Sequence, residues 1–283
     1  MLEILLIPFI ACLILTGIHC YLGIHVLMRG VIFVDLALAQ VAAMGAAVAI
    51  AAGFHGDSTA AYGFALAFTI LGAGVFSLAR FQEHRVPQEA VIGIVYAVTS
   101  AVTILILSRS AGERDEIEHM LVGELLFVGW PTIIKTLAIY IPVALLHVFC
   151  RRPFFAISRD GDRHGMTPLQ LRAWDFLFYA SFGVVVTSSV QIAGVLLVFC
   201  FLIVPAACAA LFAKRVGARL VLGWAIGAGA SLAGLFASGM WDLPTGPAVV
   251  AALGAAFCIA GLVYALRTLR APHEVASPPS TRR

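Results

Sequence analysis

Charged residues are scarce in this sequence: Asp, Glu, Lys and Arg make up 12% of its 283 residues, whereas apolar residues make up 61%. A soluble domain is usually about half apolar and a quarter charged, so this composition excludes an ordinary soluble protein. Apolar runs of about twenty residues recur from end to end, which is the length that crosses a hydrocarbon layer of about 30 Å. The first run has no basic segment before it, so we interpret it as a retained span rather than a signal peptide. The sequence therefore predicts an all-α, polytopic membrane protein.

The sequence also lacks the short motifs of nucleotide binding and catalysis. It contains no GxxxxGK[ST], HExxH or GxSxG pattern, so we do not expect the chain to bind ATP through a phosphate loop or to be an enzyme. Its six cysteines show no CxxC pairing, which argues against a zinc cluster or a disulfide framework. We expect no permanently bound cofactor and no nucleic-acid partner. If ATP drives this protein, a separate ATPase must hydrolyse it.

Apolar windows predict eight or nine membrane-spanning helices in one domain, residues 1–270, followed by a Pro- and Ser-rich tail, 271–283, that we expect to be disordered. The number is nine if the long apolar block 173–213 turns at its polar stretch, TSSVQIAG. Basic residues gather in alternate connections. The positive-inside rule places those connections and the C-terminus in the cytoplasm, and the N-terminus outside. The predicted spans are 3–27, 31–53, 60–80, 88–108, 130–150, 173–189, 191–213, 219–240 and 246–267.

Four polar side chains lie inside the first two predicted spans, where leucine would cost less: His19, His25, Asp35 and Gln40. An ionisable group at membrane depth costs roughly 2.5–3.5 kcal/mol on insertion scales and usually faces a cavity or a partner. Imidazole and carboxylate groups bind first-row divalent metals, and an amide oxygen is a weaker ligand. We predict that these four residues line a metal path. The alternative is that they only form hydrogen bonds between helices.

Two connections carry further candidate sites. In the outer loop, His119 and Glu124 could ligate a metal, although a solvated acidic loop would carry the same residues. In the largest cytoplasmic loop, a threonine followed by a proline has the signature of a helix start. We predict a short cytoplasmic helix there, with three candidate contacts for an ATPase: Thr167, Arg172 and Asp175.

Five stretches, in this order along the chain, resemble the membrane permeases of ABC-type zinc, manganese and iron(II) uptake systems. The stretch RGVIFVDLALAQVAAMG is similar to the family's second-helix signature, R-x-x-F-x-G-D-x-x-x-H-x-x-x-x-G, and QEAVIGIVY is similar to its fourth helix, beginning at Glu89. The others are MLVGELLFVGW, VQIAGVLLVFCFLIVPAACAALFA and DLPTGPAVV. The resemblance implies a type II ABC importer-like bundle in the lipid bilayer. Its implied partners are a second permease copy or paralogue, a cytoplasmic ABC ATPase dimer and an extracytoplasmic metal-binding protein.

The chain departs from that signature at two positions. When Gln40 is aligned with the family histidine, the family aspartate falls on Leu36, and the acid of this chain stands one position earlier, at Asp35. One residue is about 100° of helix rotation, so Asp35 need not face where the family's acid faces. Glutamine is also a poorer zinc ligand than histidine. The two histidines of the first helix could compensate, or the chain could carry a harder ion such as Mn²⁺ or Fe²⁺.

These observations predict the permease subunit of an ATP-driven importer in the cytoplasmic (inner) membrane, moving a divalent transition-metal ion: zinc, manganese or iron. One alternative is an ABC importer for a metal chelate such as a siderophore or cobalamin. A stand-alone proton-coupled carrier or a membrane-embedded enzyme is a more distant alternative. A carrier would need no ATPase, so co-purification of an ATPase separates these classes.

The predicted sidedness can be tested by labelling single cysteines in a background that lacks the native ones. An impermeant thiol reagent applied to intact cells should label a cysteine near Ser58 and should leave a cysteine near Asp162 unlabelled. Labelling near Asp162 would overturn the topology, because that position would then face the outside.

Overall fold

The computed structural model describes residues 2–56, 58–79, 86–108, 125–160 and 165–270, and within these ranges every regular element is helical. The predicted tail, together with His119 and Glu124, lies outside the described residues. The elements are α1 (Leu2–Arg29), α2 (Val34–Ala51), α3 (Thr59–Ala79), α4 (Gln88–Leu107), the 3₁₀ turn η2 (Leu125–Phe127), α6 (Trp130–Phe149), α7 (Arg151–Asp160), α8 (Pro168–Phe212), α9 (Val216–Trp241) and α10 (Thr245–Arg270).

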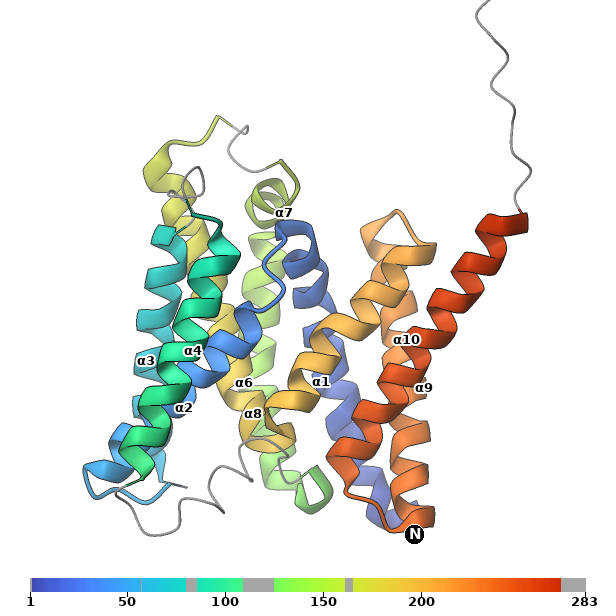
Figure 1. Cartoon of the computed structure of the whole chain (residues 1–283), viewed down its shortest axis with the longest axis horizontal. Helices are drawn as coiled ribbons and strands as arrows, with labels where there is room; N and C mark the ends of the chain where they lie inside the picture. The colour runs from blue at the N-terminus through green and yellow to red at the C-terminus, as the bar shows by residue number, and fades with distance from the viewer. Residues whose placement is uncertain (1, 57, 80–85, 109–124, 161–164, 271–283) are drawn as a thin grey trace, which may run out of the picture.

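Helix α8 supplies two membrane crossings rather than one. Its 45 residues would extend about 68 Å as a straight helix, roughly twice the hydrocarbon thickness. At Gly194 the backbone leaves helical geometry, with φ 71° and ψ 164°, a conformation that only glycine adopts readily. Figure 1 shows the two parts of α8 running in opposite directions from this turn. Eight described helices are long and apolar enough to span, and the divided α8 raises the crossings to nine, which confirms the predicted turn within TSSVQIAG.

The connections divide between two ends of the bundle (Figure 1). The N-terminus, the α2–α3 connection and the α9–α10 connection lie at one end. The α1–α2 and α8–α9 connections, α7 and the end of α10 lie at the other. The second end carries the basic residues of the described connections, such as Arg151, Lys214 and Arg215. The positive-inside rule assigns it to the cytoplasm, and we call the two ends outer and cytoplasmic.

The largest cytoplasmic connection differs from the prediction. Thr167 does cap a helix: its side chain accepts from the Gln170 backbone N–H at 3.3 Å, and its own N–H donates to the Gln170 side chain at 2.9 Å, which is a capping box. That helix is not a short cytoplasmic one, because it continues into the membrane as α8. The short cytoplasmic helix is α7, which the sequence analysis missed. It buries Phe154 and Ile157 and exposes its arginines.

Close helix packing depends on small residues. A Cβ added at Gly23 of α1 would lie 1.9 Å from the Leu202 carbonyl oxygen of α8, and one at Gly45 of α2 would lie 2.7 Å from the Phe64 carbonyl oxygen of α3. Glycine at these contacts allows the backbones to approach, as is common between membrane helices. Helix α8 is central, since it packs against α1, α2, α3, α9 and α10.

A buried ion pair joins three elements at the cytoplasmic end. Arg29, the last residue of α1, donates to the Asp175 carboxylate of α8 at 2.7 Å, and their side chains are 3% and 0% exposed. The same guanidinium donates to Ser158 Oγ of α7 at 3.0 Å and lies 3.9 Å from the centre of the Phe178 ring. Each charge is therefore desolvated and depends on the other.

Asp175→Asn should destabilise the chain by about 3–5 kcal/mol, because it leaves the Arg29 charge buried without its counter-ion. The measurement is thermal unfolding of the purified protein in detergent. Asp242→Asn is the matched control, since Asp242 is exposed at the outer end in a left-handed conformation that asparagine tolerates. Equal melting temperatures for the two variants would contradict a structural role for the pair. Replacing both Arg29 and Asp175 by leucine should recover much of the loss.

Candidate functional site

Asp35 carries a carboxyl group into the interior of the bundle. The residue is 1% exposed, and its Oδ1 has no hydrogen-bond partner among the described residues. It stands in the first turn of α2, where the helix dipole favours an acid by about 0.3–1 kcal/mol. That gain is smaller than the roughly 2.5–3.5 kcal/mol cost of a charge at membrane depth. The dipole alone therefore does not offset the cost of a charged aspartate here, and a cation or a hydrogen-bond donor beside Oδ1 would stabilise it.

His19 is oriented like a metal-binding histidine. Its Nδ1 lies 2.8 Å from the Leu15 carbonyl oxygen, and because a carbonyl only accepts, Nδ1 must carry the proton. In the neutral ring Nε2 then presents its lone pair. Metal-ligating histidines commonly donate their other N–H to a backbone carbonyl in this way. Here Nε2 lies 3.2 Å from Ser189 Oγ of α8, and His19 itself is fully buried.

Tyr140 of α6 lies beside His19. Its hydroxyl forms a short hydrogen bond with Ser189 Oγ, the same oxygen that faces His19. The Tyr140 and His19 rings are 6.3 Å apart. Asp35 is near enough for its charge to act on Tyr140, although no hydrogen bond joins the two among the described residues. We define the polar cluster as His19, Tyr140 and Ser189, which are in contact, together with the neighbouring Asp35.

The other two predicted residues lie elsewhere. Gln40 is half-buried and stands about 140° around α2 from Asp35 by helix periodicity. His25 is buried at the cytoplasmic end, where its Nδ1 lies 2.9 Å from Ser158 Oγ. Ser158 donates its own proton to the Phe154 carbonyl at 2.8 Å, so His25 donates to Ser158. His25 therefore belongs with the Arg29–Asp175 ion pair rather than with Asp35.

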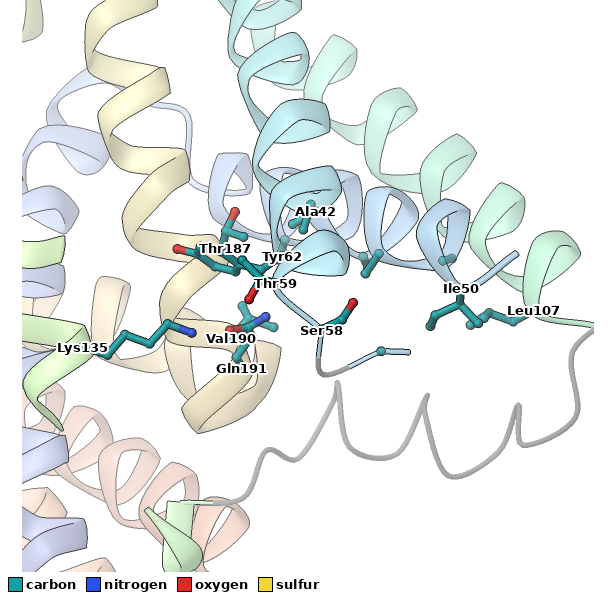
Figure 2. Close-up of a pocket in the computed structure, with 16 residues that line it drawn as sticks. Ala42, Ile50, Ser58, Thr59, Tyr62, Leu107, Lys135, Thr187, Val190 and Gln191 are labelled. Carbon is teal, nitrogen blue, oxygen red and sulfur yellow. The ribbon is translucent and has the colours of Figure 1, made fainter. Parts of the chain in front are cut away.

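A cavity of about 530 Å³ lies on the outer side of the polar cluster. Figure 2 shows residues from α2, α3, α6 and α8 around it. Its wall on α2 includes Ala39, Ala42 and Ala46, which are four, seven and eleven positions after Asp35 and so continue the same helix face. The stripe begins one turn outward from Asp35. Three further lining residues, Ala43, Ala47 and Ile50, follow Leu36 by seven, eleven and fourteen positions, so Asp35 and the family's position lie at the two edges of the helix face that lines the cavity.

Polar groups on the cavity wall come from three further elements. Tyr62 of α3 lies beside Ser188 of α8, and Thr187 of α8 hydrogen-bonds Thr69 at 3.0 Å. Gly56, Ser58 and Thr59 of the α2–α3 region complete the outer side. The cavity thus reaches from the outer end of the bundle toward the polar cluster.

No closed metal cage exists in the part of the chain that the structure describes: no three His, Cys, Asp or Glu side chains there are grouped to hold an ion. The sequence analysis also missed Tyr140 and Ser189 as site residues. Ser189 lies in TSSVQIAG, whose polarity was attributed only to the turn. A tyrosine in mid-span, with a hydroxyl that needs a partner when buried, was the available signal for Tyr140.

The predicted ATPase contacts are divided by the structure. Thr167 and Arg172 are exposed at the cytoplasmic end, whereas Asp175 is fully buried in its pair with Arg29. Asp175 is therefore inaccessible to a partner, and the earlier prediction for this residue is revised.

Known proteins that are similar to this chain include membrane proteins of manganese and iron transport systems. The chain is 26% identical over 250 residues to the manganese transport system membrane protein MntC of Halalkalibacterium halodurans, covering 87% of this chain and 83% of MntC. It is 26% identical over 263 residues to the chelated iron transport system membrane protein YfeC of Yersinia pestis, covering 88% and 86%. PsaBC from Streptococcus pneumoniae, solved in complex with Fab, shares the fold, with a TM-score of 0.72, 21% identity and coverage of 91% and 90%.

The sequence profile of one transport family matches residues 1–264, nearly the whole chain. This match confirms the resemblance found in the sequence. Together with the apolar helices, it identifies the chain as a multi-pass membrane transport protein rather than an enzyme. The chain belongs to the ABC 3 transport family.

Proposed function

We propose that this chain is the permease subunit of an ATP-driven importer that carries a divalent transition-metal ion, Mn²⁺ or Fe²⁺. The observation that carries the proposal is the buried Asp35 carboxyl, which has an oxygen without a partner in the described structure and stands one helical turn inward from Ala39, a residue that lines the cavity. The family assignment supports the transporter class, and the names of its relatives, manganese and iron systems, support the choice of ion.

The proposed path begins in the outer cavity and passes Tyr62 and Thr187 to reach the polar cluster. There Asp35 supplies a carboxylate oxygen, a hard ligand that suits Mn²⁺ and Fe²⁺, and His19 supplies the lone pair of Nε2. The hydroxyls of Tyr140 and Ser189 supply neutral oxygens. Such a set binds a passing ion without enclosing it. An ion that moves onward needs a site that is weak enough to release it, unlike a closed tetrahedral zinc site.

The proposed partners follow from what the chain lacks. Because it carries no phosphate loop, we assign ATP hydrolysis to a separate cytoplasmic ABC ATPase dimer. Its contact surface would include the exposed Thr167 and Arg172 and the exposed arginines of α7. An extracytoplasmic metal-binding protein would deliver the ion at the outer end, and a second permease copy or paralogue would complete the assembly.

Cavity size favours one second candidate, an importer of a metal chelate. A volume of about 530 Å³ falls in the range of pockets that hold drug-sized ligands, roughly 300–1,000 Å³, and it is larger than a bare ion requires. One relative is named for chelated iron. Competition between Mn²⁺ and a ferric chelate in one uptake assay separates the two candidates.

Asp35→Asn should abolish metal uptake, because it keeps the shape of the side chain and removes the charge that attracts the ion. Uptake of radioactive manganese by cells that express the complete transporter is the measurement, together with co-purification of the ATPase as a check on assembly. The matched control is Asp242→Asn, which makes the same substitution at an exposed position of the outer end. Unchanged uptake in Asp35→Asn would refute the pathway role and leave interhelical bonding as the explanation.

A further inference from the structure

The cavity wall includes a lysine, which is unexpected on a path for cations. Lys135, one of only two lysines in the chain, stands on α6 about 7.5 Å inward from the outer start of that helix by helix rise. Figure 2 shows its side chain extended from α6 toward the cavity-lining residues of α3 and α8. Its Nζ lies 4.9 Å from the centre of the Tyr62 ring, a cation–π contact.

Lys135 brings a positive charge to the wall of this cavity. Among the described residues that line it, no other side chain is charged. The lysine also lies on the outer side of the polar cluster. Its side chain is exposed, and its Nζ lies over the ring of Tyr62, which lines the same cavity. An ion that entered by this cavity would come close to the ammonium group.

We propose that Lys135 is the electrostatic gate of the outer cavity. Its ammonium occupies the face of Tyr62 that would attract a cation, and it repels metal ions from the route to Asp35. Transport then requires that the side chain leave Tyr62 or that an acidic group offset its charge while the ion passes. This inference rests on the proposed function, because it takes the cavity as the entrance of the metal path.

The size of the effect follows from Coulomb's law. A divalent ion about 6 Å from a single positive charge is repelled by about 1.4 kcal/mol even at the dielectric constant of water, which corresponds to a factor of about ten. Repulsion is greater at the lower effective dielectric constant of a protein cavity. Removing the charge should therefore speed the passive influx of Mn²⁺ at least about tenfold.

The experiment reconstitutes the permease with its ATPase subunits into lipid vesicles and omits both ATP and the metal-binding protein. Mn²⁺ alone is added outside, and its influx is followed by quenching of a dye trapped inside. Lys135→Gln and Lys135→Met should each leak at least about tenfold faster than the unmodified protein. Lys135→Arg keeps the charge, so its passive Mn²⁺ influx should be as slow as that of the unmodified protein. Lys214→Gln removes the other lysine, which is exposed at the cytoplasmic end. Its passive Mn²⁺ influx should also be as slow as that of the unmodified protein.

Two results would overturn the gate. One is a leak in Lys135→Gln and Lys135→Met no faster than in the unmodified protein, as expected if the lysine only extends its charge to outer water. The other is an equal leak in Lys135→Arg, which would make the effect one of shape rather than charge. If ATP-driven uptake by the unmodified transporter persists in either case, the proposed function stands and only the gate is wrong. Adding Asp35→Asn to Lys135→Gln should suppress the leak. A leak that persists there would keep the gate and refute the path past Asp35.

Discussion

The ion pair between Arg29 and Asp175 fastens the end of α1 to the beginning of α8, at 2.7 Å and with both side chains shielded from solvent. Because either charge alone would be buried without compensation, the two helices are held together at their cytoplasmic ends. Farther into the membrane, the same two helices bring His19 to face Ser189. The geometry of the polar cluster therefore depends on a bond that lies outside it, and Ser158 ties α7 to the same bond.

The charges of the interior differ in how they are compensated, and this difference separates structural from functional roles. Arg29 has the Asp175 carboxylate as its counter-ion, with a hydroxyl and an aromatic ring beside it, although its Nη2 has no hydrogen-bond partner among the described residues. Asp35 is as deeply buried, but among the described residues it has neither a salt bridge nor a partner for Oδ1. Such groups at membrane depth are expensive and usually mark an ion or substrate route. Lys135 faces the cavity instead, where its charge acts on what enters.

Several features of the fold could be predicted from the sequence, and their physical reasons are local. The length of the apolar runs predicted the membrane spans. The polar TSSVQIAG stretch predicted the turn that the structure has at Gly194, and Thr167 predicted the N-terminal cap of α8. Long-range contacts could not be predicted in this way. Asp175 looked like a surface residue of a cytoplasmic helix because the sequence does not show that Arg29, 146 positions earlier, is its partner. The same limit applies to the site: the four polar residues of the first two spans were predicted to line one path, whereas the structure places His25 beside Ser158 and places His19 beside Ser189 and Tyr140.

The central claim is that a metal ion on its way through the permease is held by Asp35. Diffraction from crystals of the transporter soaked in Mn²⁺, recorded on both sides of the manganese absorption edge, locates the ion directly by its anomalous signal. The account predicts a manganese peak at coordination distance from the Asp35 carboxylate, on the side that faces Tyr140 and His19. A manganese peak elsewhere within the membrane-spanning bundle, with none beside Asp35, would contradict it.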